Sequence, residues 1–351
     1  MSGEIVTVEV GGARYTAWKS VCVRAAVKEA CRGATLTIAA EAGAAATHRK
    51  FELFKPLKIF AGDDPVLDGY IDGRLPHMTA TEALITIRIR AKGQDAVDCS
   101  AVHKTHEIRN KTPLGIAQEL DQFGIGFSSE ADLQPIPLFR VTKGETVFRA
   151  VERACRDQGL TLSGKADGGI ELWNAKKGMK RHARGLVEGV NMKVIAAEHN
   201  GCNRHSHVHV HGQSHAGHGP QALQIEGLAQ DSTVPRYRPL VMVHDGETDK
   251  TRAGAKAKGR RDRGAGNGLS ATITTPSWRD DGGVLWTPGY RVWVESEFAD
   301  VTQDMLLESV DFAQDGDGGG TCAQLRLVDP RAHGGDKGKQ NKSGSGWSMP
   351  E

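Results

Sequence analysis

The chain has 351 residues, and its 45 lysines and arginines against 43 aspartates and glutamates leave a formal net charge of only +2. Proteins dedicated to nucleic-acid binding usually carry a clear basic excess, so this balance argues against that class. No run of about 18 apolar residues occurs, and we expect no membrane span. The six cysteines are widely scattered without a C-x-x-C pair, which indicates reduced thiols rather than a zinc or redox site.

Residues 1–97 are expected to form a first antiparallel β-barrel. Apolar residues alternate with polar ones from Val6 to Val10 and from Ile85 to Ile89, and Gly11-Gly12 supplies a hairpin turn. Short strands at this spacing, with turns between them, are typical of a small barrel or sandwich.

Residues 98–183 change to a mixed α+β pattern. Thr112 and Pro113 predict a helix start, with Gly124 as its stop. A second helix is predicted from the apolar stripe Val147, Phe148, Val151, Ala154 and Cys155, followed by two short strands to Trp173. This stretch carries no reactive groups, which favours an architectural role.

The remainder alternates between strands and one candidate helix. We expect residues 184–212 and 269–330 to form a second, similar β-barrel, and residues 213–268 to join 98–183 in an outer α+β domain. Residues 249–266 favour a helix, but their four glycines each cost roughly 1 kcal/mol relative to alanine, so packing must hold it. Residues 331–351 are rich in Gly, Lys and Ser, and we expect a flexible tail.

A histidine run is the one feature that resembles a chemical site. His205, His207, His209 and His211 alternate with Ser206, Val208 and Val210, so on a strand they share one face, about 6.5–7 Å apart. Neutral imidazoles suit zinc, nickel or iron. The competing interpretation is a half-buried strand with the valines inward and the histidines in water or at a subunit surface, and in that case no metal and no other cofactor is expected.

Other motifs point away from catalysis. Residues 250–263 hold seven basic side chains against the carboxylates of Asp249 and Asp262. These cations either grip phosphates, or form the solvated side of a helix, or pair with an acidic neighbouring subunit. The stretch DGDGGG at 315–320 lacks the spaced acids of an EF-hand calcium loop. The chain contains no G-x-S-x-G, P-loop or H-E-x-x-H pattern.

Five stretches, in order, resemble the baseplate hub proteins of Mu-like contractile-tailed phages, within the late-control gene D family that also includes the N-terminal part of type VI secretion spike proteins. The stretches span most of the chain, and they are GYIDGRLPHMTATEALITIRIRAKGQDAVDCSAV (69–102), NKTPLGIAQELDQFGIGF (110–127), KGETVFRAVERACRDQGLTLSGKADGGIELW (143–173), PRYRPLVMV (235–243) and GGVLWTPGYRVWV (282–294).

The resemblance implies a non-enzymatic virion protein of the tail baseplate, assembled in the bacterial host cytoplasm. Such hubs form a homotrimer whose two barrels per subunit make a pseudo-sixfold ring between the hexameric tail tube protein and the trimeric central spike protein. Neighbouring baseplate proteins surround the ring, and DNA passes through its channel without specific binding. The histidine run departs from the Mu pattern, so a metal site there has no support from the family.

Two other functional classes stay open at this level. One is a metal-binding module or metalloenzyme centred on residues 205–211. The other is a spike-associated cell-wall hydrolase, for which the sequence shows no convincing pair of carboxylates.

Overall fold

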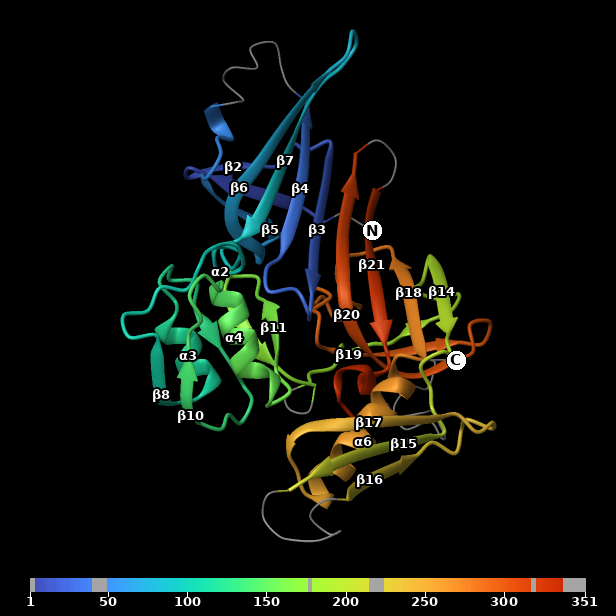
Figure 1. Ribbon diagram of the computed structural model, residues 1–351. Helices are drawn as coiled ribbons and strands as arrows, with labels where there is room; N and C mark the ends of the chain where they lie inside the picture. The colour runs from blue at the N-terminus through green and yellow to red at the C-terminus, as the bar shows by residue number, and fades with distance from the viewer. Residues whose placement is uncertain (1–3, 40–48, 176–178, 215–223, 317–319, 337–351) are drawn as a thin grey trace.

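The computed structural model describes residues 4–39, 49–175, 179–214, 224–316 and 320–336 (Figure 1). Strands far outnumber helices, which confirms the mainly β fold class. Among the described residues, no helix is both long and apolar enough to cross a bilayer.

The largest sheet has 13 strands, and its strands come in two groups, one from residues 6–91 and the other from residues 186–328. The first half contains β1 (Val6–Val10), β2 (Ala13–Tyr15), β3 (Ser20–Ala26), β4 (Gly33–Ala39), β5 (Pro56–Ala61), β6 (Asp64–Met78) and β7 (Ala83–Ala91). The second half contains β13 (Leu186–Val187), β14 (Val194–His199), β18 (Leu269–Thr275), β19 (Arg291–Ser296), β20 (Val301–Asp315) and β21 (Gly320–Val328). The strand order runs β14-β18-β21-β20-β3-β4-β7-β6-β5-β1-β2, with β13 and β19 attached beside β20.

The two halves are joined edge to edge by the pairing of β3 with β20. The two strands are antiparallel from Ser309 opposite Ala26 to Asp315 opposite Ser20. Alternation places Val23 and Phe312 inward, where one continuous apolar core extends from Val6 in the first half to Leu327 in the second. Because they share both a backbone ladder and a core, the halves form one body.

An inserted α+β domain packs beside this sheet (Figure 1). Its elements are α2 (Gln94–Asp98), β8 (Glu107–Lys111), α3 (Pro113–Glu119), β9 (Phe127–Ser128), β10 (Ile136–Arg140), α4 (Val147–Arg156), β11 (Thr161–Gly164) and β12 (Ile170–Trp173). The Thr112 and Thr146 hydroxyls accept backbone N–H bonds and start α3 and α4, as the sequence predicts for α3. This domain has an apolar core of its own.

A small three-stranded sheet with one helix forms a further module. It contains β15 (His207–Gln213), β16 (Ile225–Gln230), β17 (Pro239–Glu247) and α6 (Lys250–Gly266), in the order β16-β15-β17. Residues 207–212 were expected in the second barrel. The pairing contradicts this, because β15 is antiparallel to β16 and parallel to β17 and joins no strand of the large sheet.

Close backbone approach, rather than helix propensity, holds α6 in place. A Cβ on Gly227 of β16 would lie 2.2 Å from the Ala253 carbonyl carbon, and one on Gly266 would lie 2.1 Å from the Ala332 nitrogen. Ala332 belongs to η1 (Pro330–His333), a short 3-10 helix. The sequence predicts a flexible tail from residue 331, and this is wrong for residues 331–333, which belong to this 3-10 helix. Residues 337–351 lie outside the described part.

Candidate functional site

The histidine run forms a row on the outer face of the small module's sheet. Val208 and Val210 point inward and are buried, while His207, His209 and His211 share the opposite face. Their ring centroids lie 6.3 Å and 6.5 Å apart, and the rings are stacked nearly parallel. His205 precedes the strand. This arrangement, with the valines inward and the histidines on the surface, is the one that the interpretation without a metal describes.

Hydrogen bonds to neighbouring side chains orient two of these rings. His209 Nδ1 lies 2.7 Å from Glu226 Oε1, and His207 Nδ1 lies 2.9 Å from Ser206 Oγ. For His205, burial and then the nearby guanidinium of Arg260 lower the pKa. None of these contacts brings ring nitrogens of two histidines together.

The row does not have the geometry of a metal centre. Zinc binds imidazole nitrogen at about 2.0–2.1 Å, so two ligands of one ion must converge to within roughly 4 Å. Parallel rings more than 6 Å apart do not converge in this way. Among the described residues, no group of three or more His, Cys, Asp or Glu side chains could hold a metal ion.

The histidine row is flanked by exposed apolar side chains. Leu228 and Val241 stand directly opposite His209 on the neighbouring strands, and the Tyr237 ring lies 5.3 Å from that of His207. Leu228, Val241 and Tyr237 are 49%, 61% and 73% exposed. A mixed surface of this kind suits protein recognition better than catalysis.

The basic cluster at 250–263 is the outer side of α6. Ala253 and Ala257 face the sheet, while several of the cations are already paired. Arg261 donates to Asp262 at 2.6 Å, and Arg252 lies 3.5 Å from Asp249. This supports the interpretation of the cluster as the solvated side of a helix.

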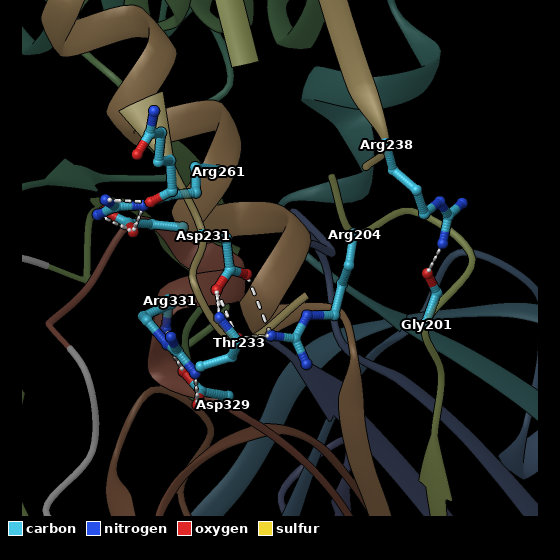
Figure 2. Close-up of polar contacts among 10 residues, drawn as sticks. Gly201, Arg204, Asp231, Thr233, Arg238, Arg261, Asp329 and Arg331 are labelled. Carbon is cyan, nitrogen blue, oxygen red and sulfur yellow. Dashed lines mark hydrogen bonds and ion pairs between the residues drawn. The ribbon is translucent and has the colours of Figure 1, made fainter. Parts of the chain in front are cut away.

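A cluster of polar contacts, which we name the polar joint, lies where this module meets η1 at the end of the large sheet (Figure 2). The Arg204 guanidinium donates to Asp231 at 3.1 Å and to Thr233, and Arg238 donates to the Gly201 carbonyl at 2.7 Å. At the end of β21, Arg331 donates to Asp329 at 2.9 Å. Every side chain in the joint is engaged in fixing loops, so the joint is structural.

A buried histidine–aspartate pair, which the sequence analysis missed, is also structural. His182 Nδ1 lies 2.9 Å from Asp280 Oδ2, and the Thr287 N–H donates to His182 Nε2 at 3.2 Å. Burial lowers the pKa of His182. Burial alone would raise the pKa of Asp280, but the Val284 N–H and His182 outweigh it and hold the pKa low. With both ring nitrogens occupied, His182 cannot exchange a proton with a substrate.

A cavity of about 460 Å³ lies between the inserted domain and the large sheet. Its lining includes Glu130, Glu171, Trp173, Lys180 and Tyr290. Burial, and then the Glu130 carboxylate, raise the pKa of Glu171. Glu130 itself is exposed, and two lysines line the same space, so the cavity does not present the acid and base of a glycoside hydrolase.

Both the sequence and the fold of this chain are similar to those of known phage tail proteins. Residues 93–174, the inserted domain, match the family model described as the second domain of gp44-like baseplate hub proteins. Over 323 residues the chain is 28% identical to the baseplate hub protein gp44 of Escherichia phage Mu, covering 87% of this chain and 83% of that protein.

Two solved structures share the fold over nearly the whole chain. The 43 kDa tail protein of prophage MuSo2 from Shewanella oneidensis superimposes with a TM-score of 0.80 at 24% identity, covering 94% of this chain and 99% of that one. The tail protein from Neisseria meningitidis MC58 gives a TM-score of 0.76 at 22% identity, with coverage of 94% and 99%. The resemblance to Mu-type baseplate hub proteins that the sequence predicts is therefore confirmed, through the inserted domain, the similarity to Mu gp44 and the shared fold.

Proposed function

We propose that this protein is a structural baseplate hub of a contractile phage tail, and that its function is assembly rather than catalysis. The similarity to Mu gp44 over most of the chain carries the proposal. The histidine row, the buried His182–Asp280 pair and the cavity beside Glu171 offer no catalytic arrangement, and this supports a non-enzymatic role without a cofactor. The protein belongs to the virion and assembles in the host cytoplasm.

The hub is a homotrimer in which each subunit contributes two similar units to a pseudo-sixfold ring. The two halves of the 13-stranded sheet, joined through β3 and β20, support this division. Residues 1–97 form the first unit, and residues 184–206 with 269–330 form the second. In the described part of the chain the main strand path of the sheet ends in two different strands, β2 and β14, so a closed ring that uses these ends has heterologous contacts between subunits.

The ring joins the hexameric tail tube to the trimeric central spike and encloses the DNA channel. Neighbouring baseplate proteins contact its periphery. Each lysine or arginine that reaches a phosphate adds affinity for DNA, so a channel for passage excludes basic clusters. The exposed cations of α6 accordingly lie outside the bore, and a trimer structure with Arg252 and Arg263 lining it would contradict this.

Complementation combined with particle imaging tests the proposal. A lysogen or phage that lacks this gene should produce no complete contractile tails, and the full chain supplied in trans should restore them. Density for three copies at the base of the tube, between tube and spike, is the expected result. Complete tails without the gene, or density for the chain elsewhere in the virion, would refute the hub assignment.

A metal assay addresses the alternative centred on residues 205–211. We expect protein purified without an affinity tag to carry bound zinc, nickel or iron at well below one ion per chain. One ion per chain, lost when His207 and His209 are replaced by alanine, would revive the metal-binding alternative.

A further inference from the structure

The β14 end of the large sheet carries a concentration of carboxylates around exposed apolar side chains. We name this surface the acidic edge, and it consists of Glu188, Val190, Val194, Glu198, Glu295, Glu297, Phe298 and Asp300. Within the part of the chain that the structure describes, no lysine or arginine forms a salt bridge with any of its five carboxylates, although Lys193 lies in the same stretch. The surface is therefore strongly negative.

Phe298 projects from the centre of the acidic edge. It is 88% exposed, more than any other large apolar residue among the exposed ones of the described chain. Glu188 Oε2 accepts hydrogen bonds from the Phe298 N–H at 3.2 Å and from the Ser296 hydroxyl at 2.7 Å. His199 Nε2 lies 2.9 Å from the Ala299 carbonyl oxygen, which ties the turn to β14. An exposed aromatic ring on a turn whose backbone is fixed by hydrogen bonds is a common form of anchor residue at a protein interface.

The opposite end of the same sheet has the complementary character. We name this surface the basic edge, and it consists of Arg14, Arg49, Lys50, Leu53, Phe54 and Lys55. The segment 49–55 packs beside β2, because the Phe51 ring lies 5.7 Å from that of Tyr15 and Lys50 Nζ lies 5.7 Å from the same Tyr15 ring. Leu53 and Phe54 are 45% and 80% exposed. Two carboxylates, Glu9 and Glu52, oppose these four cations.

We propose that the acidic edge of one copy docks onto the basic edge of a second copy of this chain, with Phe298 inserted beside Leu53 and Phe54. This inference rests on the proposed function, since it names the contact that closes the ring. In Figure 1, β2 and β14 lie at opposite sides of the molecule, so one chain cannot join its own two edges. The contact is heterologous and repeats from copy to copy.

The charges and positions of the two edges favour a second copy of this chain, rather than a different protein, as the partner of the acidic edge. The two edges lie at the two ends of the strand path of one sheet. Both carry exposed apolar residues, and their charges are of opposite sign. Complementary surfaces of opposite sign speed association and reject like-charged partners. Within one chain the halves already meet across β3 and β20, where Arg24 donates to Asp311 at 2.9 Å. Docking of the acidic edge of one copy onto the basic edge of the next adds a second junction, between sheet halves that belong to different copies.

Reversing the charges on each edge tests the proposal directly. The full chain is examined by sedimentation velocity in four forms: wild type, Glu297→Lys with Asp300→Lys, Arg49→Glu with Lys50→Glu, and all four changes together. We expect each one-sided reversal to weaken self-association by about tenfold or more. The fourfold variant should regain most of it, because every contact is again between opposite charges. Phe298→Ala should also weaken association.

A variant outside the two edges serves as the matched control for nonspecific effects on association. Leu138→Ala removes a large exposed apolar side chain from β10 of the inserted domain, which belongs to neither edge, and should leave association unchanged. A wild-type trimer that survives both one-sided reversals and Phe298→Ala would overturn this inference and leave the hub assignment intact. Failure of the fourfold variant to associate, with a native circular dichroism spectrum, would also overturn it. A monomeric wild type would refute self-assembly of the ring and this contact together.

Discussion

Glu308 concentrates the interactions that lock the junction of the two sheet halves. It lies on β20 where the pairing with β21 shifts register between Leu307 and Ser309. Its Oε1 lies 3.0 Å from His333 Nε2, and Arg326 donates to Oε2 at 2.9 Å. Lys28, just after β3, approaches within 3.6 Å. One carboxylate thus connects η1, β21 and the first half of the sheet.

The size of its contribution follows from its pKa. The hydrogen bond from His333, with help from Arg326 and against the effect of burial, lowers the pKa of Glu308 from 4.5 to about 2. Each pKa unit corresponds to about 1.4 kcal/mol, so the ionised carboxylate stabilises the fold by up to about 3 kcal/mol. Because the folded-state pKa is depressed, this stability is present above pH 4.5 and is lost as the pH falls from there toward about 2.

The test is Glu308→Gln, measured by urea unfolding at about pH 7 and about pH 3 at matched protein concentration. The variant should lose about 1–3 kcal/mol at neutral pH. The gap to wild type should narrow at about pH 3, because the Glu308 carboxylate of the unfolded wild-type chain is then protonated while that of the folded chain is still ionised, so part of the stabilisation is lost. Glu152→Gln removes a carboxylate that is 40% exposed and paired with Arg156, and should change little at either pH. An equal deficit of Glu308→Gln at both pH values would refute the electrostatic explanation.

Three further predictions concern the core, the helix and the buried histidine. Phe312→Ala should cost about 3–5 kcal/mol in urea unfolding, since Phe312 is 2% exposed in the shared core; a loss below 1 kcal/mol would show that the halves do not share it. Gly266→Val should destabilise by about 1–3 kcal/mol through its clash with Ala332, whereas Gly254→Ala, in open space on the same helix, should stabilise by about 0.5–1 kcal/mol; equal effects would refute the close-approach argument. Burial lowers the pKa of His182, so wild-type stability should fall as the pH drops below about 6.5, and His182→Asn should show a shallower fall.

Local patterns in the sequence predict the elements of the inserted domain well. In α4 the stripe Val147, Val151, Ala154 and Cys155 is buried, and the salt bridge from Glu152 to Arg156 forms at 2.7 Å. Glu145 and Arg149 are also four positions apart, but no salt bridge joins them in the described part of the chain. Glu145 precedes the Thr146 cap and lies outside the helix, so its carboxylate meets Arg153 instead, at 2.8 Å. Periodicity locates a helix face well but locates its ends less precisely.

Long-range pairing is where the sequence is least informative. Arg24 and Asp311 are separated by 287 positions, and nothing in the alternation of either strand specifies the other as its partner. The histidine strand shows the same limit: its Val208 and Val210 indicate one buried face, but either the large sheet or α6 could cover it. The buried His182–Asp280 pair could not be predicted from the sequence either, because the two residues are 98 positions apart.

A trimer that matches a sixfold partner needs two kinds of junction between equivalent units. The junction within the chain is built from a backbone ladder between β3 and β20 and from a common core, so the angle between the two halves is set when the chain folds. The proposed junction between chains has no covalent link and depends on side chains, Phe298 among them. If both are needed, loss of Phe298 should leave the monomer folded and abolish the ring, whereas loss of Phe312 should disturb the fold itself. Comparing thermal unfolding with sedimentation for these two variants separates them, and a Phe312→Ala chain that folds normally but fails to associate would contradict this division of roles.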